Sequence, residues 1–247
     1  MTKQNSFVAL ATLLLVACNN QPTSNTSNEV SSPAPETRPL VEEVLTKEQR
    51  DALSPDEVLQ SFERGNLRFI NSDLTARDHS AQVRKSATGQ FPKAVVLSCL
   101  DSRVPVEDVF DRGIGDIFVG RVAGNFVNED LLGSMEFACK VAGAKLILVL
   151  GHEYCGAVKA AIDDVKLGNI TALVSKIRPA VEKVEYEGDR SSSNEEFVHL
   201  VCESNVNHTI EQIRLNSPIL KEMEDNGEIK IVGGIYDMET GVVTFMD

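Results

Sequence analysis

Two short apolar segments, residues 94–99 and 144–150, constrain the fold of this chain more than any other feature. Each reads as a buried strand, because it is largely apolar, as expected for strands covered on both faces of a parallel sheet. Cys99 closes the first segment, and His152 and Cys155 follow the second. In open α/β sheets, ligands bind at the carboxyl ends of the strands. The sequence therefore predicts an α/β fold that brings these three side chains to one edge of the sheet.

The chemistry of the three side chains indicates a zinc site. Two thiolates and one imidazole are ligands that zinc prefers, and a catalytic zinc keeps its fourth tetrahedral position for water. A cysteine at the end of a buried strand is by itself usually a core residue. The prediction of one Zn²⁺ per chain therefore rests on Cys99, His152 and Cys155 together. Gly151 and Gly156 flank the second pair, as expected where the backbone approaches an ion closely.

Two charged residues follow the first cysteine closely, Asp101 and Arg103. Charged side chains at the end of a buried strand are costly unless they serve a purpose. A carboxylate can only accept hydrogen bonds, and an arginine can bind it through two parallel bonds. We expect Asp101 to orient a zinc-activated hydroxide, and Arg103 to keep Asp101 ionised and turned away from the metal. Both are predicted to be catalytic.

These segments resemble the zinc motifs of the β-class carbonic anhydrases, Cys-x-Asp-x-Arg followed later in the chain by His-x-x-Cys. The similarity extends over roughly residues 57–247 and includes four further segments, Gly89–Pro92, Asp116–Asn125, Ile231–Asp237 and Gly241–Phe245. One departure is visible: plant-like members place a tyrosine where this chain has Phe137. One hydroxyl of the pocket is therefore absent.

The resemblance implies a carbonate dehydratase that hydrates CO2 reversibly to bicarbonate and a proton by means of zinc-bound hydroxide. It implies a central, mostly parallel sheet with flanking helices, an antiparallel edge strand and an N-terminal helical arm. In the substrate pocket, the amide of Gln90 would hold an oxygen of CO2 or bicarbonate. Phe118 and Ala123 would form an apolar lining, and Gly156 would offer its backbone N–H.

Three alternatives stay open on the sequence. Hydrolases of carbonyl sulfide or carbon disulfide use the same fold and ligands on similar linear, apolar substrates. A non-catalytic zinc-binding protein is a second alternative, although a structural site has no use for Asp101 and Arg103. The third is regulated closure, in which Asp101 leaves Arg103 and binds zinc itself. Gln90 favours the open form, because closed-type members of the family usually lack it.

Residues 54–71 predict an amphipathic helix. Ser54, Pro55 and Glu57 form a helix-start signature with an N-cap serine, a proline at the first position and a glutamate at the third. The resemblance implies that this arm reaches across a partner subunit in a homodimer or homotetramer, with the active site at the interface. The alternative is a helix that packs on its own domain.

Residues 1–17 match a lipoprotein signal peptide. Lys3 precedes a short apolar core, residues 7–17, which is too short to span a membrane. Leu15-Val-Ala-Cys18 places small residues before a cysteine, which predicts cleavage before Cys18 and lipidation of its thiol. An ordinary signal peptide cut near Ala17 is the alternative.

A lipidated flexible tether is predicted for residues 18–45, and the catalytic domain for residues 46–247. The tether is rich in Ser, Thr, Asn, Pro and Glu and lacks apolar periodicity, so ordering it would not be repaid by burial. We expect a membrane-attached protein of a bacterial cell envelope that faces the periplasm. Asn19 is not an acidic retention signal, which favours the outer membrane if the source is Gram-negative.

The remaining polar and sulfur-containing residues add few constraints. The formal net charge is −13 without a basic cluster, which argues against nucleic acid as a partner. Cys139 and Cys202 fall in predicted helices, 131–142 and 195–215, and read as buried core thiols. The other histidines are interpreted as surface or helix-packing residues: His79, His199 and His208. A proton relay is the less favoured alternative for His79.

Overall fold

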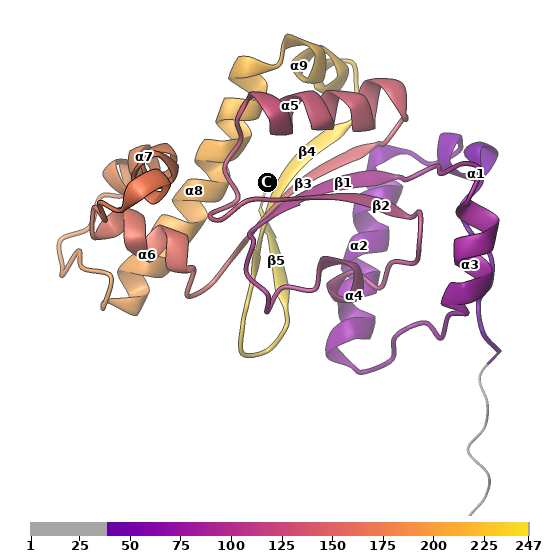
Figure 1. Ribbon diagram of the computed structural model, residues 1–247, viewed down its shortest axis with the longest axis horizontal. Helices are drawn as coiled ribbons and strands as arrows, with labels where there is room; N and C mark the ends of the chain where they lie inside the picture. Colours follow the sequence, from indigo (N-terminus) through magenta and orange to yellow (C-terminus); the bar gives the residue numbers. More distant parts are fainter. Residues whose placement is uncertain (1–38, 247) are drawn as a thin grey trace, which may run out of the picture. The chain divides into compact units, whose positions relative to one another are not determined.

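The computed structural model describes residues 39–246 as an α/β fold around a five-stranded sheet with the order β2-β1-β3-β4-β5 (Figure 1). Four strands run parallel and the fifth is an antiparallel edge, as predicted. The strands are β1 (Ala94–Ser98), β2 (Ile117–Arg121), β3 (Leu146–His152), β4 (Lys230–Tyr236) and β5 (Val243–Met246).

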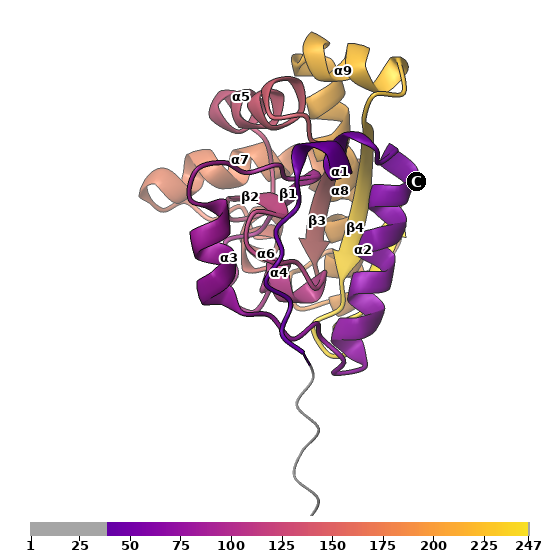
Figure 2. The ribbon, with the colours of Figure 1, turned by 90° about the vertical axis from the view of Figure 1, so that its right-hand side faces the viewer.

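Helices cover both faces of this sheet. Figures 1 and 2 show α2 on one face and the long α8 on the other. The described helices are α1 (Lys47–Asp51), α2 (Pro55–Ile70), α3 (His79–Ser86), α4 (Val106–Val109), α5 (Glu129–Glu136), α6 (Gly156–Ile162), α7 (Gly168–Lys183), α8 (Glu195–Asn216) and α9 (Pro218–Asp225). A π-helical turn, η1 (Phe137–Val141), extends α5. Among residues 39–246, no helix is both long and apolar enough to cross a membrane.

Strand β1 shows why both faces must be covered. All of its residues are buried, and they alternate between two apolar cores. Val95 and Leu97 belong to the core beneath α5 to α9, whereas Ala94 and Val96 belong to the core beneath α2 and α4. This alternation follows from the two-residue period of a strand. A strand that is apolar on both faces is stable only at the centre of such a layered fold.

Helix α2 begins where the sequence predicts. The Ser54 side chain accepts a hydrogen bond from the Glu57 backbone N–H, and the Glu57 carboxylate accepts one from the Ser54 N–H. Val58 and Phe62 are fully buried against the chain's own sheet, while Leu67 is 56% exposed. The helix therefore packs on its own domain, and its reach toward a partner stays a prediction.

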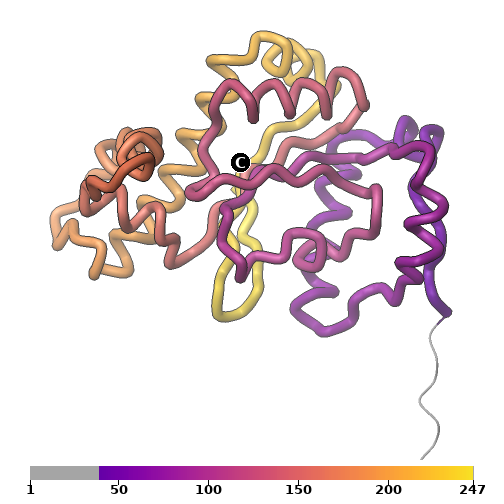
Figure 3. Tube along the Cα trace, viewed as in Figure 1, coloured from indigo at the N-terminus to yellow at the C-terminus, as the bar shows by residue number. Residues whose placement is uncertain are grey.

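The folded domain begins before the predicted boundary at residue 46. Val41 forms a parallel bridge with Arg77, and the Val41 N–H donates to the carbonyl of Ala76 (2.8 Å). Glu43 accepts a hydrogen bond from Lys85 of α3 (2.7 Å). Figure 3 shows this first described segment running beside α3. The last residues assigned to the tether are thus bonded to the domain, while the predicted signal peptide and Cys18 lie outside the described residues.

The two predicted core thiols are buried and free, Cys139 in η1 and Cys202 in α8. Burial raises the pKa of each thiol to about 12, because a thiolate would lose its hydration there. Both side chains therefore behave as small apolar residues, as expected from the sequence.

A buried carboxylate joins α2 to the loop after α4. Asp111 accepts hydrogen bonds from Arg68, from Arg77 Nη1 (2.6 Å) and from the Thr75 hydroxyl (2.7 Å). Burial by itself would raise the pKa of Asp111, but the hydrogen bonds from Thr75, Arg68 and Arg77 outweigh it and hold the pKa at about 2. Asp111 is therefore an ionised carboxylate in the folded protein at neutral pH, held by these three donors.

We predict that Asp111→Asn lowers the free energy of unfolding at pH 7 by about 3–5 kcal/mol, because Arg68 and Arg77 lose a buried partner. The pKa of Asp111 is lower in the folded than in the unfolded chain, so ionisation of Asp111 adds about 2.5 kcal/mol to the free energy of unfolding, in full above about pH 4. This contribution is lost as the pH falls toward 2. Denaturant titrations of both proteins at several pH values measure this difference.

The matched control is Asp225→Asn, which breaks an exposed pair with Lys221 and should change the free energy of unfolding by less than about 1 kcal/mol. If the difference in the free energy of unfolding between wild type and Asp111→Asn stayed constant from pH 4 to pH 2, Asp111 would not be the titrating group.

Candidate active site

The three predicted metal ligands meet at the carboxyl ends of β1 and β3. Ser98 pairs with Leu150 in the parallel register, so Cys99, directly after β1, lies beside the end of β3. His152 is the last residue of β3, and Cys155 is the N-cap of α6. All three side chains are buried, and their ligand atoms lie within 4.8 Å of one another. This is the group predicted from the sequence.

The geometry of the group fits zinc. Cys99 Sγ and Cys155 Sγ are 3.9 Å apart, and two sulfurs at about 2.3 Å from a tetrahedral zinc would be separated by about 3.8 Å. The Nδ1–H of His152 donates to the carbonyl of Glu153 (2.8 Å), which leaves a lone pair on Nε2. This Nε2 is buried and has no hydrogen-bond partner among the described residues. A buried nitrogen without a partner is explained by a metal ion.

Hydrogen bonds at the sulfurs favour a thiolate. The Cys155 thiol donates to Cys99, and together with the Gly124 N–H (3.3 Å) this hydrogen bond lowers the pKa of Cys99 well below that of a free thiol. Cys155 correspondingly has a raised pKa, because it is the donor in this bond and is buried. Zinc would displace the shared proton, since the metal binds cysteine as the thiolate.

The two glycines beside the second pair differ in their surroundings. A Cβ on Gly151 would lie 2.7 Å from Val206 Cγ2, so this glycine allows α8 to pack on the sheet. A Cβ on Gly156 would meet no described atom within 4 Å. Gly156 therefore leaves open space at the start of α6, beside Cys155.

Asp101 and Arg103 form the predicted pair next to the ligands. Arg103 Nε donates to Asp101 Oδ1 (3.0 Å), and Arg103 Nη2 donates to Oδ2 (2.8 Å). Asp101 Oδ2 lies 3.9 Å from His152 Nε2. Hydrogen bonds from the Arg103 side chain lower the pKa of Asp101 to about 2. The carboxylate is therefore ionised at neutral pH and turned toward Arg103, which is the open arrangement.

Arg121, at the end of β2, holds the loop that carries this pair, and the sequence analysis did not identify it. Its Nη1 donates to the carbonyl of Cys99 (2.9 Å), and its Nη2 donates to the carbonyl of Val104 (2.7 Å). These two carbonyls lie on either side of Asp101 and Arg103. The only available signal was a charged residue at a strand end, which does not indicate what it contacts.

The predicted pocket residues divide into two groups. Ala123 lies in the turn whose Gly124 N–H contacts Cys99, and Gly156 follows Cys155, so both are next to the metal ligands. Gln90 is exposed and precedes β1, at the opposite end of the strand from Cys99. Phe118 lines a cavity of about 570 Å³ under α5 that includes no metal ligand. Within one chain, the structure therefore does not bring Gln90 and Phe118 to the metal centre.

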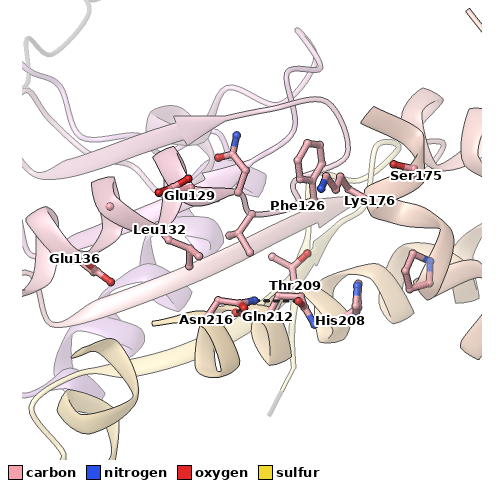
Figure 4. A pocket seen from close by; sticks show the side chains of 14 residues that line it. Phe126, Glu129, Leu132, Glu136, Ser175, Lys176, His208, Thr209, Gln212 and Asn216 are labelled. Atoms are coloured by element: carbon pink, nitrogen blue, oxygen red, sulfur yellow. Dashed lines mark hydrogen bonds between the residues drawn. The ribbon is translucent and has the colours of Figure 1, made fainter. Parts of the chain in front are cut away.

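The other histidines lie outside this centre. His79 begins α3, and His199 lies 3.4 Å from Glu153 and from Glu203. His208 lines a cavity of about 750 Å³ between α5, α7 and α8, which contains no metal ligand (Figure 4). Burial lowers the pKa of His208 and favours the neutral ring. These positions agree with surface or helix-packing roles.

The fold and the site together define a zinc-binding α/β protein with a Cys-His-Cys centre. Comparison with known proteins extends this description. The sequence model of the family described as "Carbonic anhydrase" matches residues 94–243. The chain is 33% identical over 200 residues to "Carbonic anhydrase 2" of Mycobacterium tuberculosis, across 78% of this chain and 94% of that protein. It is 34% identical over 196 residues to the carbonic anhydrase of Mycolicibacterium smegmatis, across 77% and 92%.

Solved structures show the same fold. A Coccomyxa β-carbonic anhydrase in complex with acetazolamide superimposes with a TM-score of 0.60 at 26% identity, over 76% of this chain and 83% of that chain. The β-carbonic anhydrase CcaA gives 0.60 at 24% identity, over 78% and 86%. The chain belongs to the β-class carbonic anhydrases. It is a zinc-dependent carbonate dehydratase that hydrates CO2 reversibly.

We predict that Cys155→Ser loses zinc and activity together, because a hydroxyl is a much poorer zinc ligand than a thiolate. Zinc per chain is measured by elemental analysis, and CO2 hydration by stopped flow. Cys139→Ala is the matched control: it removes a buried thiol outside the ligand group and should keep one zinc per chain. Full zinc occupancy in Cys155→Ser would contradict the ligand assignment.

Proposed function

We propose that this carbonic anhydrase hydrates CO2 with Asp101 as the residue that orients the reacting water and Arg103 as the residue that positions Asp101. The observation that supports this most is the location of the carboxylate, bound by Arg103 on one side and 3.9 Å from His152 Nε2 on the other. Zinc, when bound by Cys99, His152 and Cys155, supplies a Lewis acid that makes water a nucleophile near neutral pH.

The ionised state of Asp101 determines its part in the reaction. Its pKa of about 2 leaves it a carboxylate at neutral pH, which can only accept hydrogen bonds. It accepts the hydrogen bond of the reacting water and so directs an oxygen lone pair toward the carbon of CO2. Arg103 occupies both carboxylate oxygens and thereby keeps Asp101 from rotating onto the metal.

The substrate would occupy the space beside Cys155. Gly156 leaves this space open and its backbone N–H is available to a CO2 oxygen, while Ala123 offers an apolar surface nearby. Gln90 and Phe118 lie away from the chain's own ligands. We infer that they serve a partner's site across an interface, in a homodimer or homotetramer. Two β-carbonic anhydrases from Sordaria macrospora, similar in fold at a TM-score of 0.58 and 23% identity, are described as tetrameric.

We predict that Asp101→Asn and Arg103→Ala each lower kcat/KM for CO2 hydration by about 100-fold or more, the scale for loss of one orienting group. The amide introduced by Asp101→Asn can also donate a hydrogen bond, and without Arg103 the carboxylate is free to rotate onto the metal. Both variants should keep one zinc per chain. Stopped-flow hydration with a pH indicator measures the rates.

Asp108→Asn, an exposed carboxylate on the neighbouring helix α4, is the control and should hydrate CO2 at the wild-type rate. Hydration by Asp101→Asn at a near wild-type rate with full zinc would refute the proposed pair.

We also propose that the protein is attached to a bacterial envelope membrane through lipid on Cys18, on the periplasmic side. The support is the sequence Leu15-Val-Ala-Cys18 and the polar segment that follows it. One acyl chain binds a membrane weakly, at about 0.8 kcal/mol per buried CH2, so stable attachment requires more than one chain on the cysteine.

Cys18→Ser should abolish lipid attachment and give either a soluble protein or an uncleaved precursor. Zinc content and CO2 hydration should stay unchanged, because the metal ligands are Cys99, His152 and Cys155. Cell fractionation and intact mass measure the outcome. Wild-type protein found in the cytosol with Met1 intact would contradict the proposal.

A further inference from the structure

The cavity of about 750 Å³ between α5, α7 and α8 is separate from the metal centre, because no metal ligand lines it. Figure 4 shows side chains of α5 on one side of this cavity, among them Glu129 and Glu136, and side chains of α8 on the other, among them Thr209 and Gln212. Small-molecule sites in proteins commonly have volumes of about 300 to 1,000 Å³. The cavity is therefore large enough to admit a ligand.

Thr209 is the residue that most strongly indicates a ligand. It is only 1% exposed and lines the cavity. A threonine in a helix can donate its hydroxyl proton to a backbone carbonyl three or four residues earlier. The Thr209 hydroxyl makes no such bond and has no hydrogen-bond partner among residues 39–246. A buried hydroxyl without a partner in the protein is destabilising, so its position favours a molecule in the cavity that bonds to it.

The preceding residue of α8 provides a second such atom to the same cavity. Nδ1 of His208 is buried and has no hydrogen-bond partner in the described part of the chain. The Glu211 carboxylate lies 3.8 Å from it, which is beyond hydrogen-bond distance. Burial, followed by the charge of Lys183, lowers the pKa of His208, so the neutral ring predominates at pH 7. A neutral imidazole offers one donor and one acceptor.

Polar groups around these two atoms retain bonding capacity of both kinds. Gln212 Oε1 accepts from Asn216 Nδ2 (3.1 Å), which leaves the N–H groups of the Gln212 amide as donors (Figure 4). Glu136 Oε1 accepts from the Ser217 hydroxyl (2.6 Å), which leaves Oε2 as an acceptor. Both Gln212 and Glu136 line the cavity. A ligand there thus meets hydrogen-bond donors as well as acceptors.

The charges of the lining do not favour an anion. Two carboxylates of α5, Glu129 and Glu136, stand against one ammonium group of α7, that of Lys176. Among the described residues, no hydrogen bond or ion pair joins the Glu129 or the Lys176 side chain to another residue, so both are free to contact a ligand. Since the His208 ring is neutral, the lining carries one negative charge in excess. A ligand without negative charge fits these surroundings.

We propose that this cavity is a binding site for a neutral sugar, a mono- or disaccharide. Hydroxyl groups both donate and accept hydrogen bonds, as the mixed donors and acceptors of the lining require. Sugar hydroxyls bond to Thr209 Oγ1 and His208 Nδ1, the two atoms that the described chain leaves without a partner. The C–H faces of the sugar ring contact the apolar part of the lining, which includes Phe126, Leu132 and Pro179.

The direct test is a ligand-observed NMR titration of the zinc-loaded, full-length protein with methyl glucoside and with trehalose. At least one of these neutral sugars should bind at a single saturable site. Methyl glucuronide has the same ring as methyl glucoside with a carboxylate added, and it should bind about tenfold more weakly, because Glu129 and Glu136 repel it. If neither neutral sugar bound saturably, the cavity would hold only water and the proposal would be wrong. Tighter binding of methyl glucuronide would equally overturn it.

Thr209→Val tests the location of the site. The substitution removes the hydroxyl, nearly preserves the shape and helix propensity of the side chain, and should weaken sugar binding about tenfold. Thr244→Val, the same substitution on an exposed position of β5 outside the cavity, is the matched control and should bind sugar like wild type. Both variants should keep one zinc per chain, because neither residue is a metal ligand. Unchanged binding in Thr209→Val, or equal weakening in both variants, would place the sugar elsewhere.

The Tm of Thr209→Val separates ligand binding from a structural role of the hydroxyl. Because this hydroxyl is buried without a partner, its replacement by a methyl group should keep or raise the Tm of the sugar-free protein. Added sugar should raise the Tm of wild type more than that of Thr209→Val, since a ligand that binds the folded state stabilises it. Effects of sugar on the solvent are common to both proteins and cancel in this comparison. A lower Tm of sugar-free Thr209→Val than of wild type would show that the hydroxyl is bonded within the protein, and would refute the site.

Discussion

The parallel pairing of β1 with β3 is the constraint on which the metal centre depends. Cys99 and His152 are far apart in the sequence, and the register that sets Ser98 opposite Leu150 brings them to one point. That register is fixed because every residue of both strands is buried, so a shift by one residue would exchange the side chains of the two cores. The apolar packing of the sheet therefore determines the distance between the two sulfurs as well as the fold.

The electrostatics of the centre follow from its ligands. Two thiolates and a neutral imidazole cancel the charge of the ion, so zinc here acidifies water less than zinc held by three histidines. Other residues must compensate by fixing the reacting groups in place. Arg103 fixes Asp101, and Arg121 fixes the backbone on both sides of that pair by binding the carbonyls of Cys99 and Val104. Orientation thus depends on two arginines from different segments of the chain.

The sequence predicted those parts of the fold that depend on local signals. The apolar runs of β1 and β3, the cap formed by Ser54 and Glu57, and the chemistry of the metal ligands are all visible within a few residues. Arg121 was missed because its partners lie on another segment, and nothing near it in the sequence indicates them. The start of the domain was placed too late for the same reason, since the backbone partners of Val41 lie farther along the chain, at Ala76 and Asp78. The resemblance identified Gln90 and Phe118 but does not show which chain's site they serve.

The two ends of the sheet differ in the charged groups that they bring together. The carboxyl end collects thiolate, imidazole and carboxylate groups, which together require a cation. The amino end instead collects arginines: Arg68 and Arg77 both bind the buried carboxylate of Asp111, and Arg112 donates to the backbone carbonyls of Phe110 and Ser61. Because a buried charge is costly unless it is paired, each end depends on its counter-charge: a metal ion at the carboxyl end, and Asp111 between Arg68 and Arg77 at the amino end.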